Sequence, residues 1–164
     1  MILRTIGVGI LCLFLIGGTF FLILQPESAE AGFTSESVSD LTEFIADSQV
    51  ALNLRLMALD ALRKKTDKGI EGELEDLAEG SDFQIAVFAT TALGKKKTAD
   101  AKTKLKNLLT STKLDSDIRK SAMTAIAVHF KDKDDLTCLK LQTASDSKLK
   151  AHCTWLETYI YGGK

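Results

Sequence analysis

The sequence predicts an all-α fold, a right-handed α-solenoid of about four helical pairs, on three observations. A nine-residue pattern occurs four times, at 54–62, 85–93, 118–126 and 149–157, in steps of 31, 33 and 31 residues. The strict alternation of apolar and polar residues that is typical of strands is absent. No proline follows Pro26 to interrupt a helix. A fixed period of about 30 residues is typical of stacked supersecondary units.

Each copy of the nine-residue pattern begins with a large apolar residue and usually has Arg or Lys at position two. Position eight holds Ala or Leu, and positions one, five and eight lie on one face of a helix. Small residues on that face let a neighbouring helix approach closely. Each copy is therefore predicted to be the second helix of a pair. The small residues at position five are Ala58, Ala89, Ala122 and Cys153.

The first helix of each pair is predicted from two apolar residues spaced three apart, shortly before each copy. These are Leu41 and Phe44, Leu74 and Leu77, Leu105 and Leu108, and Leu136 and Leu139. Helix ends are predicted from local chemistry. Gly69, Gly80 and Gly94 follow apolar runs, where a glycine in the left-handed conformation commonly ends a helix. Ser81–Asp82 and Ser116–Asp117 stand where N-caps are expected.

This pattern resembles the HEAT repeat, in particular the short bacterial form named after the phycobilin lyases. The second helix of that form reads roughly V-R-x-x-A-x-x-A-L-G. Residues 118–126 match it well, and residues 85–94 match all but the arginine, whereas the fourth copy departs most. The resemblance covers about residues 38–161. It implies an armadillo-like solenoid that serves as a protein-binding scaffold, with a chromophore lyase or lyase subunit as the alternative.

An uncharged run of 19 residues at 6–24 follows Arg4 and precedes Glu27. As a helix it would span about 28 Å, close to the thickness of a bilayer core. The positive-inside rule then places the repeats outside the cytoplasm. Either the run is an uncleaved membrane anchor, or cleavage after Ala31 releases a secreted or periplasmic domain. We divide the chain into an anchor or signal peptide at 1–31, a linker at 32–37 and a repeat domain at 38–164.

Charge argues against a nucleic-acid partner, because residues 32–164 hold 20 Lys and Arg and 20 Asp and Glu. The charges are segregated, however, with acidic residues at 71–79 and a basic strip further along the chain. Two interpretations stay open: the two groups neutralise each other on neighbouring helices, or the strip binds anionic lipid or an acidic partner. The basic strip consists of Lys95, Lys96, Lys97, Lys102, Lys104 and Lys106.

No catalytic constellation, metal site or cofactor motif is evident in the sequence, so we expect no enzymatic activity and no cofactor. The hydroxylases of the HEAT-like group use paired His-Glu dipeptides, and this chain has none. Cys138 and Cys153 are placed symmetrically about the turn at 145–146, so they either form a disulfide after export or are small core residues. His129 is expected near a helix end, where the helix dipole favours its charged form.

The expected function is a protein-interaction scaffold outside the cytoplasm with an unidentified protein partner. A self-associating structural protein of the cell envelope is an alternative. Trp155 is expected on the side of its helix opposite Leu149 and Cys153. There it is either an interface hot spot or a cover for the open end of the stack. The predicted contact residues, on the second helices, are Asp60, Arg63, Thr91, Lys120, Thr124, Trp155 and Tyr159.

Overall fold

A computed structural model describes residues 32–131, 143 and 145–162, and this part of the chain is helical and contains no strand. The predicted all-α class is therefore confirmed. The described helices are α2 (Val38–Ala46), α3 (Leu52–Lys64), α4 (Ile70–Glu79), α5 (Phe83–Lys96), α6 (Ala99–Thr110), α7 (Ser116–Phe130) and α9 (Ser147–Tyr161).

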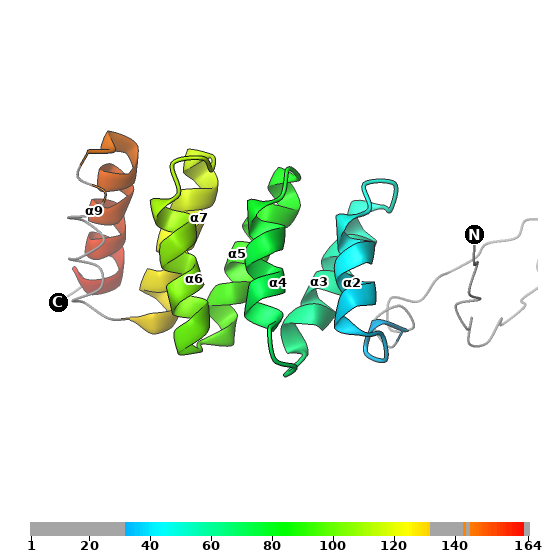
Figure 1. Ribbon diagram of the computed structural model, residues 1–164. Helices are drawn as coiled ribbons and strands as arrows, with labels where there is room; N and C mark the ends of the chain where they lie inside the picture. The colour runs from blue at the N-terminus through cyan, green and yellow to red at the C-terminus, as the bar shows by residue number, and fades with distance from the viewer. Residues whose placement is uncertain (1–31, 132–142, 144, 163–164) are drawn as a thin grey trace, which may run out of the picture.

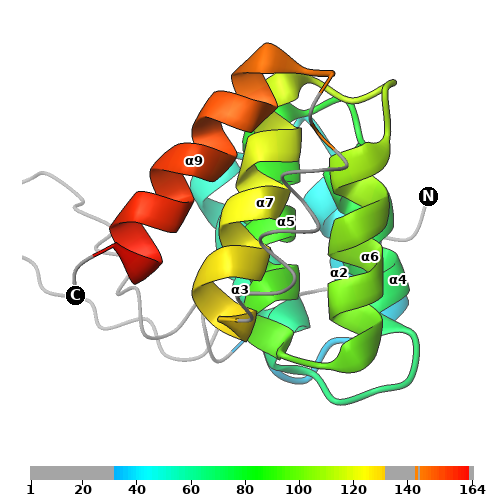
Figure 2. The ribbon, with the colours of Figure 1, turned by 90° about the vertical axis from the view of Figure 1, so that its left-hand side faces the viewer.

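The helices form two layers in the order of the chain (Figure 1). Within each pair the two helices pack against each other: α2 on α3, α4 on α5, and α6 on α7. Between pairs, α2, α4 and α6 contact one another in succession, and so do α3, α5, α7 and α9. We call these the first-helix layer and the second-helix layer. The end-on view of Figure 2 shows α4 and α6 on one side and α7 and α9 on the other.

The nine-residue copies lie in the four second helices, and their small residues lie where helices meet. Position five is fully buried in every copy, and position eight is buried as well. Position one is buried in the last three copies, whereas Leu54 of the first copy is only half-buried. The sequence pattern thus identified the face of each second helix that forms the core.

The first helices contain the predicted apolar pairs where the structure describes them. Leu41, Leu74 and Leu105 are buried. Leu136 and Leu139 lie outside the described residues. The segment at 32–37 packs against the first pair: the rings of Phe33 and Phe44 lie 5.2 Å apart.

The predicted helix ends need correction at all three glycines. Gly69 has the left-handed conformation, with φ of 96°, but it is the N-cap of α4 and does not end α3, whose last residue is Lys64. Gly80 has an extended backbone instead, and Gly94 lies inside α5. At position 94 a Cβ would lie 2.9 Å from the Cβ of Ala125, so the glycine is needed for close packing of α5 on α7. Lys97 takes the left-handed position after α5, with φ of 55°.

The two predicted N-caps also differ in outcome. Asp82 caps α5, since its carboxylate accepts hydrogen bonds from the backbone N–H groups of Gln84 and Ile85. The cap of α7 is Asp115, one residue before the predicted Ser116–Asp117, and its carboxylate accepts from the N–H of Asp117. Both caps satisfy N–H groups that have no partner within the helix.

No helix in residues 32–131 or 145–162 is long and apolar enough to cross a membrane. The run at 6–24, which the sequence predicts to be an anchor or signal peptide, lies outside the described residues.

Candidate interaction surface

One face of the second-helix layer is turned away from the core. It is defined by positions four and seven of the nine-residue pattern and by position eleven, which is the second residue after the pattern ends. These positions lie on a single face of a helix because they are three and four residues apart. Every residue there is half-buried or exposed. We call this surface the second-helix face. It consists of Met57, Asp60, Lys64, Phe88, Thr91, Lys95, Ser121, Thr124, Val128, His152, Trp155 and Tyr159.

A stack of three rings lies on α9 at one end of this face. The centroids of His152 and Trp155 are 5.7 Å apart with planes inclined by 20°, and those of Trp155 and Tyr159 are 5.2 Å apart with planes inclined by 7°. Trp155 is 54% exposed and Tyr159 is 73% exposed. The stacked rings therefore present a large apolar surface to solvent.

The stack is joined to the neighbouring helix, and two further exposed apolar side chains lie on the same face of the second-helix layer. His152 Nε2 lies 2.9 Å from the hydroxyl of Thr124 on α7. Phe88 on α5 and Val128 on α7 are exposed at positions four and eleven. In the described part of the chain, the only other large apolar side chain that is equally exposed is Phe83, which lies off this face. Exposed apolar groups of this kind indicate a binding surface when they gather together.

The opposite end of the face, on α3, is charged. Asp60 accepts hydrogen bonds from Arg63 Nη2 at 2.7 Å and forms an ion pair with Lys64 at 2.8 Å. Burial raises the pKa of Asp60, but the hydrogen bonds from Lys64 and Arg63 outweigh it and hold the pKa below its usual value. The second-helix face thus changes from charged on α3 to aromatic on α9.

The structure brings most of the predicted contact residues into this face. Asp60, Thr91, Thr124 and Trp155 all occupy position seven, and Tyr159 occupies position eleven. Lys120 and Arg63 lie beside the face, and Lys120 forms an ion pair with Asp117 at 2.8 Å. The sequence analysis did not include Phe88, Val128 and His152. They would have been found if positions four and eleven of every copy had been included among the contact residues.

The basic strip is divided between the end of α5 and the helix α6. Lys95, Lys96 and Lys97 lie at the end of α5, where Lys96 Nζ donates to the carbonyl oxygen of Lys65 at 2.7 Å. Lys102, Lys104 and Lys106 lie on α6. Lys104 forms an ion pair with Glu75 of α4 at 2.6 Å, and the hydrogen bond raises the pKa of the lysine. At this site the acidic and basic helices do neutralise each other.

The pKa of His129 shifts in the direction opposite to the one expected from the helix dipole. Burial lowers the pKa of this histidine, and the charges of Lys97 and Lys95 lower it further.

Cys153 is fully buried, and Cys138, its predicted partner, lies outside the described residues. Among the described residues no group of three or more His, Cys, Asp or Glu side chains is arranged to hold a metal ion.

Comparisons of the chain with models of known families, with curated proteins and with solved structures found no match.

Proposed function

We propose that the chain is a HEAT-like α-solenoid that acts as a protein-interaction scaffold outside the cytoplasm, held at the membrane by residues 6–24. The succession of helical pairs in two layers supports the solenoid. Further support comes from the recurrence of small buried residues at position five of every second helix. Stacks of this kind use an extended surface of one layer to bind partners.

The exposed ring stack of His152, Trp155 and Tyr159 is the observation that carries the proposal. Trp and Tyr are enriched among the residues that dominate binding energy at protein interfaces. The two ring planes of Trp155 and Tyr159 are nearly parallel in the unbound chain. Because stacking restricts the rings before a partner binds, less conformational entropy is lost when the partner packs against them.

The change from charged residues on α3 to aromatic residues on α9 along the second-helix face defines the kind of partner that this face fits. An apolar group of the partner packs on Trp155 and Tyr159, while polar groups meet Asp60 and its cationic neighbours on α3. The aromatic end supplies most of the affinity and the charged end sets the orientation. A partner segment that is apolar at one end and charged at the other, and that lies across the second helices, satisfies both.

The proposal is tested by capture on full-length variants in native-like membranes. Trp155→Ala is compared with Phe83→Ala, which removes a ring that is 50% exposed but lies off the face. A partner that uses the face should lose about 2 kcal/mol of affinity with Trp155→Ala, and Phe83→Ala should leave binding unchanged. Quantitative mass spectrometry of the captured proteins, followed by titration of the one that responds, measures the loss.

Thermal unfolding of the same variants distinguishes the two roles of Trp155. If Trp155 is a contact residue, its removal leaves the melting temperature nearly unchanged. A large fall in melting temperature would mean that Trp155 covers the end of the stack, and the contact proposal would then fail.

A further inference from the structure

The two edges of the helical stack differ in the residues that end and begin the second helices. The C-caps of α3, α5 and α7 are lysines, Lys65, Lys97 and Lys131. The N-caps of α5, α7 and α9 are aspartates, Asp82, Asp115 and Asp146. We call these the lysine edge and the aspartate edge. The second helices run in the same direction, so the lysine edge lies at the bottom of Figure 1 and the aspartate edge at the top.

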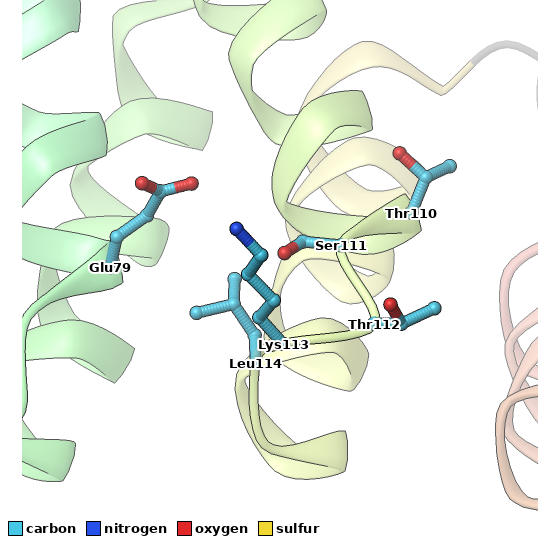
Figure 3. A pocket seen from close by; sticks show the side chains of 6 residues that line it. All are labelled: Glu79, Thr110, Ser111, Thr112, Lys113 and Leu114. Carbon is cyan, nitrogen blue, oxygen red and sulfur yellow. The ribbon is translucent and has the colours of Figure 1, made fainter.

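The surface hollows on the two edges show the same difference in charge. At the lysine edge, a hollow between the α3–α4 and α5–α6 turns is lined by Arg63, Lys64, Lys68, Lys95 and Lys96, against Asp67, Glu71 and Asp100. At the aspartate edge, the hollow drawn in Figure 3 is lined by six residues, of which Glu79 and Lys113 are the charged ones. The first hollow has an excess of positive charge, and the second has none.

Helix dipoles account for only part of the lysine edge. Cations are favoured at helix C-termini, and the ammonium group of Lys96 donates hydrogen bonds to the carbonyl oxygens of Arg63 and Lys65. Lys68, however, lies in the turn after α3, two residues before α4 begins. The side chains of Lys68, Lys95 and Lys97 are exposed. These three therefore remain accessible to a ligand outside the fold.

The N-terminal segment joins the fold at the lysine edge. Lys65 Nζ donates hydrogen bonds to the carbonyl oxygens of Thr34 at 3.0 Å and Glu36 at 2.6 Å. In the sequence, seven residues (25–31) separate the apolar run at 6–24 from Gly32. Seven residues extend to at most about 25 Å. If residues 6–24 are in a bilayer, the lysine edge is the edge held close to its surface.

We propose that the lysine edge lies against the headgroups of an anionic phospholipid bilayer, with Lys68, Lys95 and Lys97 at the lipid phosphates. Each lysine near an anionic bilayer surface strengthens attachment about fivefold. In this orientation the second helices end at the bilayer, and positions four and seven of the second-helix face stay open to a partner protein. Lys95, at position eleven of that face, belongs to the lysine edge as well. The inference rests on residues 6–24 being an uncleaved anchor.

Lysine footprinting on the full-length chain tests the orientation. The chain is reconstituted as single copies in nanodiscs of phosphatidylcholine, with or without about one third phosphatidylglycerol, and treated with formaldehyde and cyanoborohydride, which are small enough to reach both edges. Mass spectrometry then gives the rate of methylation at each lysine. In the anionic discs we expect methylation of Lys68, Lys95 and Lys97 to slow several-fold, because contact with the lipid phosphates covers their amines. The rates should recover in 0.5 M salt because screening weakens the contact.

Exposed lysines at the aspartate edge provide an internal control. Methylation of Lys113, Lys148 and Lys150 should be the same in both discs. Lys131, the C-cap of α7, also lies at the lysine edge, and its methylation should slow in the anionic discs as well. A triple variant, Lys68→Gln with Lys95→Gln and Lys97→Asn, should lose this protection of Lys131. The matched variant, Lys113→Gln with Lys148→Gln and Lys150→Gln, should retain it.

Three outcomes overturn the proposal: equal protection of both edges, no protection at the lysine edge, or extraction of the chain from the discs by carbonate. Loss of partner capture with protection intact would instead remove the scaffold function and leave the lipid contact standing.

Discussion

The joints between consecutive second helices are held in two different ways. In the α3–α5 joint, Arg55 Nε donates to the carbonyl oxygen of Ile45 at 2.6 Å, and its Nη1 pairs with Asp82 at 2.7 Å. In the α7–α9 joint, Arg119 repeats both contacts, with Leu109 at 2.9 Å and Asp146 at 3.0 Å. Each arginine therefore links the end of its own first helix to the N-cap of the next second helix. We call this contact the arginine bridge.

The middle joint, between α5 and α7, has no such bridge because position two of α5 is Ala86. The turn before α5 is also shorter, at residues 80–82 rather than the five residues at 47–51 and 111–115. Here the helices approach closely instead: a Cβ at Gly94 would lie 2.6 Å from Cδ2 of His129. The comparison shows that one repeated unit can be joined to the next either by a charged side chain or by the absence of a side chain.

The largest expected effect is the loss of the first arginine bridge. Arg55→Met keeps the length of the apolar stem but removes the donor to the Ile45 carbonyl and leaves Asp82 with only its backbone donors, Gln84 and Ile85. We expect the free energy of unfolding to fall by about 3 kcal/mol, because the Arg55 side chain is only 6% exposed. Urea unfolding of the full-length chain in detergent, followed by circular dichroism, measures it.

Arg63→Met is the control for that experiment. Arg63 pairs with Asp60 on the same helix, near the surface, so its removal should cost less than about 1 kcal/mol. Equal losses for the two variants would mean that the arginine bridge adds nothing beyond an ordinary surface ion pair.

Gly94→Ala should have the next largest effect and tests the middle joint. The ring of His129 can turn aside, but the new methyl group also meets the Cβ of Ala125 at 2.9 Å. We expect a loss of about 2 kcal/mol from overpacking. Gly72→Ala in α4, where a Cβ meets nothing within 4 Å, should instead add up to about 1 kcal/mol. If the free energy of unfolding rose in both variants, α5 and α7 would not be closely packed at Gly94.

Arg119→Met should have a smaller effect than Arg55→Met, although the contacts are the same. Both contacts of Arg119 are longer, and its side chain is 15% exposed. Water therefore replaces part of what is lost, and we expect about 1.5 kcal/mol. If the two arginine variants lose the same amount, exposure is not what determines the strength of the bridge.

The sequence predicted those features that depend on neighbouring residues in one helix. The burial of the small residue at position five, such as Ala58 and Cys153, could be predicted because spacing along a helix determines which residues share a face. The arginine at position two was visible in the pattern, but its partners were not. Asp82 lies 27 residues after Arg55, and only the stacking of one pair on the next brings the two together.

The glycines and histidines were harder to interpret for the same reason. Gly94 follows an apolar run, which is typical of a helix end, yet its role depends on Ala125 in another helix. The charge state of His129 likewise depends on burial and on Lys97, neither of which local sequence reports. On the second-helix face, position seven was selected correctly as non-core. The stacking of His152 on Trp155 required the actual side-chain conformations.

The smallest expected effect concerns pH and separates the middle joint from the last one. Burial lowers the pKa of His129 at the α5–α7 joint and of His152 at the α7–α9 joint. The charges of Lys97 and Lys95 lower the pKa of His129 further, and the charge of Lys120 lowers that of His152, against a smaller opposing effect of a hydrogen bond to the Lys120 backbone. Above the ordinary histidine pKa of 6.5 both folded and unfolded chains are neutral at these positions. As pH falls below that value, the unfolded chain binds protons that the folded chain resists, so the free energy of unfolding decreases.

The aspartates with lowered pKa values, among them Asp82 and Asp146, lose their contributions to the free energy of unfolding only at more acidic pH. A comparison of stability at pH 7.5 and pH 5.5 therefore reports on the histidines. His129→Gln and His152→Gln should each reduce the difference in melting temperature between these two pH values. His129→Gln tests the middle joint alone, because the histidine lies against Gly94. His152→Gln tests the last joint, where the partner is Thr124. A chain whose melting temperature rises on acidification in this range would contradict both assignments.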